Sequence, residues 1–538
     1  MPLKIINRRT GLGTRVLSKT SVAAAILLAL FVLQPARIVF SQQNKESRRG
    51  ERAIRHGEYD EAARIFADLM KKQPADMGAI LGESLAHFRL KQYARCFDDT
   101  GQALKIDPDN ARAHALRGYA LLRSGYFPNS IAELAEALRI NPKEALAWGA
   151  LAEIDYYNNQ TKECQRKANY AFSLDSSNAD SLMTYARASS RMEQFNQAAD
   201  AYELYLQIAP RGEKDNRDRI RGLVQFYRQL VGLHLHRIDG PRSMIASFRL
   251  GADRRPYMNI RANGRDATFV IDTGSGFTVI SVDAAKRLGV RAVARGGTSQ
   301  GVGGSGKFPI VYGLINSMNI GDERVESIPC FIRPFPEGKN PSPDTHADGF
   351  IGLSILSSFV TSLDYKRRLI SLTRAPEGQT DPIFASPDAT VIPFRTTENG
   401  LISLETRLNG THVLNAILDT AASSSVISTA AVKRLDMDAS IIKGETVQVV
   451  GAAGISDDVP LLMLHDCEVA DLQQTNMRAL VLDFAAINET SGFEQGGILG
   501  GDFLTHFKIT LDFDRGRVAL EPQTRAITRL QPPSPSSG

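Results

Sequence analysis

A short segment that ends in an acid occurs twice in this chain, and the duplication limits the folds that the chain can adopt. The first copy, at 269–275, reads FVIDTGS, and the second, at 416–422, reads AILDTAA. Asp272 and Asp419 hold the same position in the two copies. Each acid follows an apolar run typical of a buried strand, so each carboxylate is expected at a rigid turn. Two such turns predict a site built from a pair of acids.

Other features recur in the same order around the two acids. An Asn-Gly dipeptide, which is a strong hairpin signal, precedes each acid. A helix-like stretch, a glycine-rich turn and an apolar pair ending in glycine follow it. These segments are 263–264, 282–288, 301–306 and 349–352 in the first copy, and 409–410, 429–435, 451–454 and 497–500 in the second. The order predicts two duplicated, mostly β lobes at 243–376 and 390–523.

The Asp-Thr-Gly sequence at 272–274, in this order of elements, resembles the retropepsin-like branch of the aspartic proteases. The resemblance covers the β half of the chain and implies a bilobal, mostly β fold of the pepsin/retropepsin kind that hydrolyses peptide bonds in polypeptide substrates. It implies that Asp272 and Asp419 form the catalytic dyad. Thr273 and Thr420 would lock the two loops together through their hydroxyl groups. The glycine-rich turn of the first lobe would be a flap over the cleft. Its glycines are Gly301, Gly303, Gly304 and Gly306.

Hydrolysis by paired acids requires two carboxylates that share one proton. The ionised member takes a proton from water while the protonated member gives one to the carbonyl oxygen. Gly274 and Ala421 follow the two threonines, and Ala421 stands where the family has glycine. If that position required φ > 0, alanine would cost about 1–2 kcal/mol. If glycine served close backbone approach instead, the methyl group would push the loops apart.

Three alternatives to a dyad within one chain remain open at this point. Each acid could be only a turn residue at the end of a strand. The lobe pair could be a non-catalytic scaffold that binds peptides or proteins, an alternative favoured by Ala421. Asp272 could also pair with its counterpart in a second chain, which would require a dimer.

No cofactor and no metal are predicted. The turn at 301–306 fits the pattern G-x-G-x-x-G, and with Lys307 it nearly spells a phosphate-binding loop. Phe308 and Pro309 then stand where such a loop needs a hydroxyl residue and the start of a helix, so a nucleotide site is not expected. The nine histidines are scattered without metal-ligand spacing.

The first half of the chain has an internal period of 34 residues. A proline, a small residue and an aromatic residue each recur at this step, with few exceptions. The three series are Pro74, Pro108, Pro142, Ser176 and Pro210; Ala62, Cys96, Ser130, Cys164 and Ala198; and Tyr59, Tyr93, Phe127, Thr161 and Phe195. Small residues let paired helices approach closely, and proline stops the second helix of each pair. The period resembles the tetratricopeptide repeat.

This second resemblance implies an all-α solenoid over 47–235, in which a final capping helix solvates the open end. Cys96 and Cys164 belong to the small-residue series, so they are expected in the core of the solenoid. Solenoids of this kind usually present a concave surface to peptides or proteins. The repeats therefore imply a protein or peptide partner.

The N-terminus predicts export to the periplasm or the cell exterior. Residues 1–41 carry six basic residues and no acid, and the apolar run at 22–33 suits a signal peptide better than a membrane span. An uncleaved anchor over 22–40 is the alternative. Without those six residues the net charge of +5 becomes −1, so no nucleic-acid partner is expected. The Pro/Ser-rich end, 524–538, is predicted to be disordered.

Overall fold

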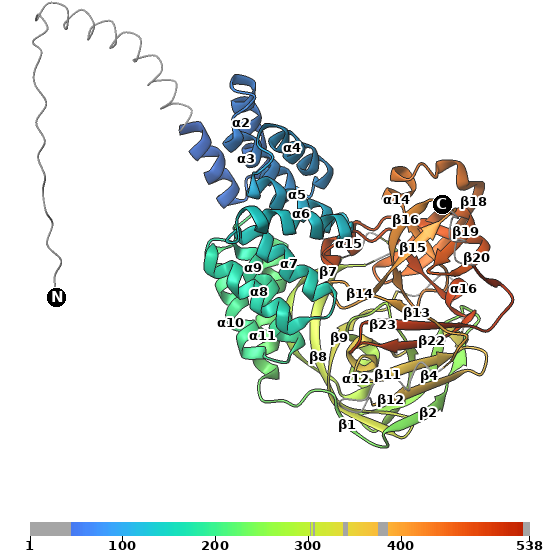
Figure 1. Cartoon of the computed structure of the whole chain (residues 1–538). Coiled ribbons are helices and arrows are strands. Elements are labelled where there is room, and N and C mark those ends of the chain that lie inside the picture. The colour runs from blue at the N-terminus through green and yellow to red at the C-terminus, as the bar shows by residue number, and fades with distance from the viewer. Residues whose placement is uncertain are drawn as a thin grey trace, which may run out of the picture.

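The computed structural model describes residues 45–530 except 213, 302, 305–306, 337–342 and 375–385. The expected export segment and the last eight residues therefore lie outside the described residues. The described chain forms a helical solenoid followed by two β lobes, as the sequence predicts (Figure 1). In the part that the structure describes, no helix has the length and apolar character needed to cross a membrane.

The solenoid consists of paired helices, and a side-chain cap fixes the starting point of one helix in each of four pairs. A helix over 45–56 comes first, and the others are α2 (Tyr59–Lys72), α3 (Met77–Arg89), α4 (Tyr93–Ile106), α5 (Ala111–Arg123), α6 (Phe127–Ile140), α7 (Ala145–Tyr157), α8 (Thr161–Leu174), α9 (Ala179–Arg191), α10 (Phe195–Ile208) and α11 (Lys214–Leu230). A capping side chain recurs at the 34-residue step before α3, α5, α7 and α9, and accepts a hydrogen bond from a first-turn N–H. The caps are Asp76, Asn110, Glu144 and Asn178. Cys96 and Cys164 are free and fully buried in the helix core, as expected.

The β half contains three sheets, and the middle sheet joins the two lobes. The first lobe has the strand order β1-β9-β6-β10-β5-β4-β8-β7, with β3 against β4. The second lobe has the order β14-β15-β16-β21-β17-β20-β19-β18, with β24 against β20. The middle sheet, β13-β23-β22-β11-β12-β2, takes three strands from each lobe.

The elements of the first lobe are β1 (Arg237–Asp239), β2 (Ser243–Ser247), β3 (Arg249–Leu250), β4 (Pro256–Ala262), β5 (Arg265–Ile271), β6 (Thr278–Ser281), α12 (Val282–Leu288), β7 (Arg291–Gln300), β8 (Lys307–Ile320), β9 (Glu323–Arg333), η1 (Pro343–Thr345), β10 (Gly349–Ile351), α13 (Leu353–Leu356), β11 (Val360–Asp364) and β12 (Leu369–Thr373). Those of the second lobe are β13 (Thr390–Pro393), β14 (Arg395–Thr396), β15 (Ile402–Leu408), β16 (His412–Leu418), β17 (Val426–Ser428), α14 (Thr429–Arg434), η2 (Asp438–Ser440), β18 (Ile441–Gly451), β19 (Gly454–Val469), β20 (Leu472–Leu482), α15 (Ala485–Ser491), β21 (Gly497–Leu499), α16 (Gly501–Leu504), β22 (Phe507–Asp512), β23 (Arg517–Pro522) and β24 (Ile527–Arg529).

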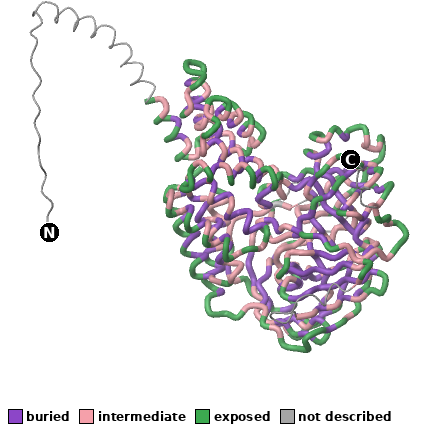
Figure 2. The backbone as a smooth tube through the Cα atoms, viewed as in Figure 1, coloured by how far each residue is buried: buried purple, intermediate pink, exposed green. Residues whose placement is uncertain are grey.

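One hydrophobic core runs through both lobes. Figure 2 shows that buried residues extend through the β half. β11 and β22 lie side by side in the middle sheet, with Thr361 opposite Leu511. Leu363 and Leu511 are fully buried in this shared core. The lobes cannot separate without exposing it to water, so the relative position of the two acids is fixed by the core as well as by their own loops.

The predicted disorder of 524–538 is wrong for its first part. β24 pairs antiparallel with β20, and Arg529 forms an ion pair with Asp471 at 3.0 Å. Ile527 packs against the core of the lobes. A sheet edge that offers unpaired backbone groups and an apolar contact is sufficient to order this segment.

The capping helix also differs from its expected role, because much of α11 faces protein. Gly222 of α11 lies against Gly296 of β7, where a Cβ on Gly222 would be 2.7 Å from the backbone N of Gly296. Phe226 stacks on Tyr312 of β8 with ring centroids 4.4 Å apart. The apolar residues of α11 thus close the solenoid against the first lobe, so the prediction of a solvating cap is wrong for this face.

The contact between α11 and β7 yields a stability prediction. Gly222→Val is expected to lower the free energy of unfolding by about 1–3 kcal/mol, because the added side chain overlaps the β7 backbone. Chemical unfolding of the full chain measures this change. Gly212→Val is the control, since a Cβ there meets nothing within 4 Å. Equal destabilisation by the two substitutions would contradict the close contact.

The second lobe inserts a loop into the solenoid. Phe493 is buried between Phe127 and Tyr157, with ring centroids 4.9 and 5.1 Å away. Arg123 Nη1 donates a hydrogen bond to the carbonyl of Gly492 at 2.6 Å. The solenoid and both lobes therefore pack as one body.

Candidate active site

Equivalent backbone hydrogen bonds hold the two acids at the ends of their strands. β5 runs parallel to β10, and the N–H of Asp272 donates to the carbonyl of Ile351 at 3.0 Å. β16 runs parallel to β21, and the N–H of Asp419 donates to the carbonyl of Leu499, also at 3.0 Å. Each acid is therefore fixed where its strand becomes a loop.

The two threonines cross-link these loops in a two-fold symmetric pattern. Thr273 Oγ1 donates to the carbonyl of Leu418, and Thr420 Oγ1 donates to the carbonyl of Ile271, both at 2.7 Å. In return, each hydroxyl accepts a hydrogen bond from the backbone N–H of the other threonine, at 3.0 and 3.1 Å. Both side chains are fully buried. The chain itself thus supplies both halves of the two-fold site, without a second chain.

The carboxyl groups of Asp272 and Asp419 act on one another, because the charge of Asp272 and a side-chain hydrogen bond with it both raise the pKa of Asp419. Asp272 Oδ1 accepts from the N–H of Gly274 at 2.8 Å, and Asp419 Oδ1 accepts from the N–H groups of Ala421 and Ala422 at 2.8 and 3.0 Å. Asp272 is 5% exposed, whereas Asp419 is half-buried. These hydrogen bonds orient both carboxyl groups toward the junction of the lobes.

Glycine is required at position 274 because the Asp419 carboxyl group lies too close for a side chain. A Cβ at this position would be 2.5 Å from Oδ1 of Asp419. Its φ lies outside the left-handed region, and so does the φ of Ala421. Ala421 therefore carries none of the backbone strain that a positive φ would have imposed, and its N–H still bonds Asp419.

The surroundings distinguish the two acids. Burial raises the pKa of Asp419, and the negative charge of Asp272 adds to this effect, so that the pKa reaches about 7. Burial also raises the pKa of Asp272, but hydrogen bonds from the Ser275 side chain and the Gly274 N–H, and the charge of Arg333, oppose the rise. The arrangement therefore favours a proton on Asp419 and a negative charge on Asp272.

Two hairpin tips meet over this junction. The β7–β8 tip carries Gly301, Gly303 and Gly304, and the β18–β19 tip spans 451–454. The N–H of Gly304 donates to Ser456 Oγ at 2.7 Å, and a Cβ on Gly303 would be 2.8 Å from the Cα of Gly451. Gly306 lies outside the described residues. No helix follows this turn, since Lys307 begins β8, which is inconsistent with a phosphate-binding loop.

The glycine that ends each apolar pair lets the strand pass close to the acid-bearing loop. A Cβ on Gly352 would be 2.5 Å from the carbonyl carbon of Phe277, and one on Gly500 would be 2.5 Å from that of Ser424. Any larger residue would displace these loops and the acids that they carry.

Two side chains that the sequence patterns did not indicate belong to the same site. Ser275 directly follows Asp-Thr-Gly at 272–274. Its hydroxyl group was the signal from which a role at the site could have been inferred. Arg333 is far from Asp272 in sequence, and only the pairing of β9 with β6 brings it near. Among the described residues, no cluster of three or more His, Cys, Asp or Glu side chains could hold a metal ion.

Comparisons with known proteins each match part of the chain. The family model described as aspartyl protease matches twice, over residues 258–355 and 404–503, and each match contains one acid. Sperm-associated antigen 1 of Mus musculus is 24% identical over 112 residues, and that of Rattus norvegicus matches to the same extent. The match covers 21% of this chain and only 12% of these relatives' length.

Two similar solved structures each match about a third of the chain. A thermophilic TPR protein of Thermus thermophilus is 19% identical, covering 34% of this chain and 98% of that chain, with a TM-score of 0.30. The MamA RS-1 ArsTM double mutant is 18% identical, covering 31% and 93%, with a TM-score of 0.23. The two matches to the aspartyl protease model, one in each β lobe, agree with a duplicated protease-like unit that follows the helical repeat region.

Proposed function

We propose that the β half is an aspartic endopeptidase that hydrolyses peptide bonds in polypeptides. The observation that supports this most is the pair Asp272 and Asp419, which their threonines cross-link into one site and whose pKa values are both raised by burial. Ionised Asp272 takes a proton from a water molecule, whose oxygen attacks the peptide carbonyl carbon. Protonated Asp419 gives its proton to the carbonyl oxygen. The hairpin tips shield the site from bulk water.

The scaffold alternative rests on Ala421, and the geometry weakens it. Ala421 has an unstrained backbone and donates to Asp419 as the equivalent Gly274 does to Asp272. A scaffold without catalysis would gain nothing from keeping two carboxylates together, because their repulsion destabilises the folded state.

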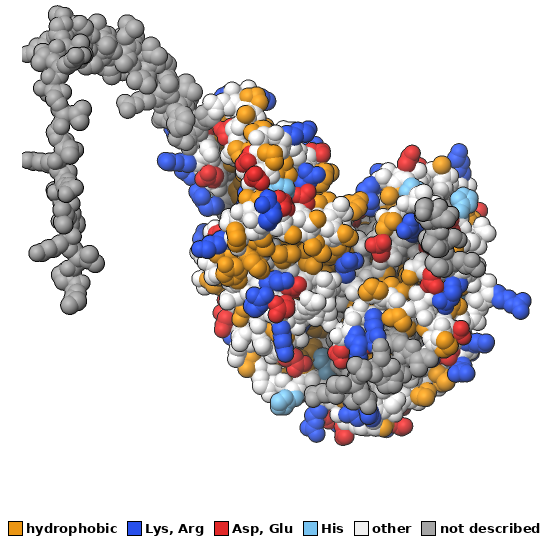
Figure 3. Space-filling view, in the orientation of Figure 1, with side chains coloured by type: hydrophobic (Ala, Val, Ile, Leu, Met, Phe, Trp, Pro, Cys, Tyr) orange, Lys and Arg blue, Asp and Glu red, His pale blue; other side chains and the backbone are white. Residues whose placement is uncertain are grey.

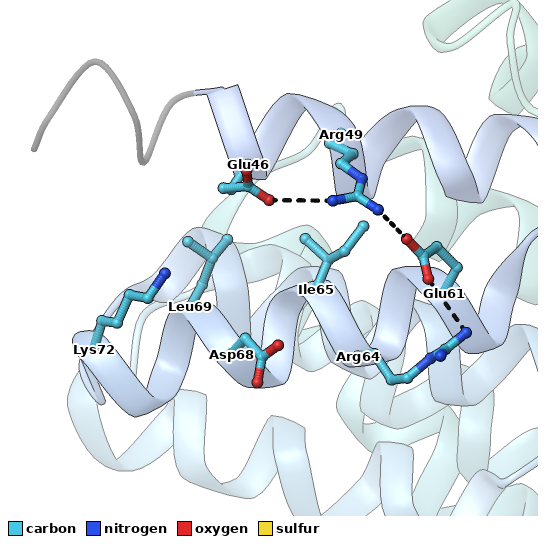
Figure 4. A pocket seen from close by; sticks show the side chains of 8 residues that line it. All are labelled: Glu46, Arg49, Glu61, Arg64, Ile65, Asp68, Leu69 and Lys72. Carbon is cyan, nitrogen blue, oxygen red and sulfur yellow. Dashed lines mark hydrogen bonds and ion pairs between the residues drawn. The ribbon is translucent and has the colours of Figure 1, made fainter.

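We propose further that the solenoid recruits a polypeptide, either the substrate or a partner. A cavity of about 1550 Å³ lies between its concave side and the second lobe, lined by apolar side chains such as Phe88 and Leu146 and by charged ones such as Arg55 and Lys91. Figure 3 shows hydrophobic side chains gathered over the solenoid face. A second cavity of about 280 Å³ lies between the first helix and α2. Four of its lining residues form ion pairs with one another, as Arg49 does with Glu61 (Figure 4). It has no part in the proposal.

The test is incubation of the full chain with a mixture of unstructured peptides, followed by mass spectrometry of new termini. Cleavage at internal peptide bonds, in the presence of a metal chelator, is the expected result. Intact peptides at every pH between 4 and 8, together with measurable peptide binding, would favour the scaffold.

The pKa shifts predict how activity depends on pH. Peptide cleavage is expected to decline as pH rises through about 7, because Asp419 loses the proton that it must donate. It also declines at low pH as Asp272 becomes protonated. The kcat/KM for a cleaved peptide, measured from pH 3 to 9, should therefore be bell-shaped. A profile that still rises above pH 8 would contradict the assigned roles.

The raised pKa of Asp419 also predicts that the free energy of unfolding falls as pH rises. An acid whose pKa is lowered by folding has the opposite effect. The folded state binds the Asp419 proton more tightly than the unfolded state, so this contribution to stability is complete below pH 3.8 and is lost as pH rises through about 7. Asp419→Asn should remove this part of the pH dependence. Denaturant unfolding of both proteins at pH 5 and pH 8 measures the difference.

A further inference from the structure

The strand position that holds Arg333 in the first lobe holds Leu482 in the second lobe. In the first lobe Ser281 of β6 lies opposite Arg333 of β9, and in the second lobe Ser428 of β17 lies opposite Leu482 of β20. The two serines are equivalent, because each caps the helix that follows it. Arg333 and Leu482 therefore occupy matching sites on the two sides of the junction.

The guanidinium group of Arg333 lies between the dyad and the hairpin tips. Its Nη1 donates to the carbonyl of Ala452, at the tip of the second hairpin, at 3.0 Å. Its guanidinium carbon lies 5.0 Å from the ring centroid of Phe335 and 5.5 Å from that of Phe308. The charge of Arg333 acts on Asp272.

Arg333 has a partly buried charge without a carboxylate partner. Within the described residues, no Asp or Glu oxygen lies within 4 Å of its guanidinium nitrogens, and the hydrogen bonds that it forms use Nη1 alone. Burial lowers its pKa, which reflects the cost of withdrawing the cation from water. A planar guanidinium group with free donors is suited to bind a carboxylate through two parallel hydrogen bonds.

The equivalent site in the second lobe is apolar. Leu482 is buried in a cluster with Val426, Phe484 and Ile498. Leu482 offers no donor, so this side of the junction cannot bind a charged group in the same way. The junction therefore presents a cation on the Asp272 side and hydrocarbon on the other.

We propose that Arg333 determines specificity by binding the carboxylate of an acidic side chain in the polypeptide substrate. The proposal rests on the endopeptidase function proposed above, and names the substrate class of that site. In the unliganded protein Arg333 bonds the carbonyl of Ala452. A substrate carboxylate forms a stronger, charge-assisted bond and takes its place.

The test compares peptides that differ only by Glu or Gln, placed in turn at each of four positions on either side of the cleaved bond. At one position, wild type is expected to prefer Glu about 10–100-fold in kcat/KM. Arg333→Gln should abolish this preference, and Arg333→Glu should transfer it to a peptide with Lys there. Arg324→Gln is the control, because Arg324 is exposed on the same strand and should leave the preference unchanged.

Binding of the same peptides to Asp419→Asn, measured by calorimetry, separates the two proposals. One possible outcome is that the Glu peptide binds more tightly, that this depends on Arg333, and that wild type cleaves neither peptide. This outcome would overturn the endopeptidase function and leave the binding role of Arg333 intact. If wild type cleaves and binds the Glu and Gln peptides equally well, the proposed role of Arg333 is overturned. If Arg333→Gln lowers kcat/KM by the same factor for all peptides, the proposed role is also overturned. Arg333 would then act only on the hairpin tip or on the dyad.

Discussion

Asp419→Asn is expected to lower kcat/KM for peptide cleavage by roughly 10²–10⁴-fold, because asparagine cannot give a proton to the carbonyl oxygen. Asp272→Asn is expected to have an effect of the same size, since the general base is lost. The substitutions should not destabilise the protein, because each one removes the repulsion between the two carboxyl groups. Steady-state kinetics on one cleaved peptide and denaturant unfolding measure the two quantities.

The double variant provides the control for this prediction. Two residues that act as one unit give non-additive losses, so Asp272→Asn combined with Asp419→Asn should be little worse than either single variant. Losses that multiply would show that the two acids work independently. Full activity in Asp419→Asn would contradict a catalytic dyad. Asp419 would then be only a turn residue at the end of its strand.

Gly274→Ala is expected to lower kcat/KM by about 10²-fold or more, although the change adds only one methyl group. Its Cβ would be 2.5 Å from Oδ1 of Asp419, so one carboxyl group must move. A displacement of about 1 Å at reacting groups is enough for a loss of this size. The overlap should also lower the free energy of unfolding by about 1–3 kcal/mol.

The reciprocal substitution, Ala421→Gly, is the matched control at the equivalent position of the second lobe. Ala421 has no positive φ, so glycine there relieves no strain. It should change kcat/KM by only a few-fold and lower stability by up to about 1 kcal/mol through the greater freedom of the unfolded chain. A gain in activity of about 10²-fold, the size of loss that a misplaced reacting group causes, would show instead that the methyl group holds the second loop away from its catalytic position.

The repeated patterns in the sequence were sufficient to predict both halves of the fold. A 34-residue period requires stacked helix pairs, because one pair cannot bury its own apolar face, and caps such as Asn110 and Asn178 recur with it. The paired Asp-Thr segments, in a fixed order of hairpin, turn and glycine, predicted two β lobes. These signals are local in sequence, so they can be read without knowledge of the fold.

Contacts between distant segments could not be predicted in this way. Nothing in the sequence of 212–235 shows that Gly222 meets Gly296, because the partner strand is reached only after the first lobe has folded. β24 is ordered for a similar reason, since its partner is an open edge of β20. A helix or strand whose second face meets another domain has the same local pattern as one that faces water.

The sequence by itself determined which acids and threonines repeat, and therefore the residues that a paired site would use. The tertiary structure decided that Thr273 and Thr420 bond across the lobes, that position 274 must be glycine while position 421 need not be, and that Arg333 lies beside only one of the acids. The physical reason is that a duplicated sequence specifies two similar loops, whereas the charge and packing around each loop come from segments that the duplication did not keep identical.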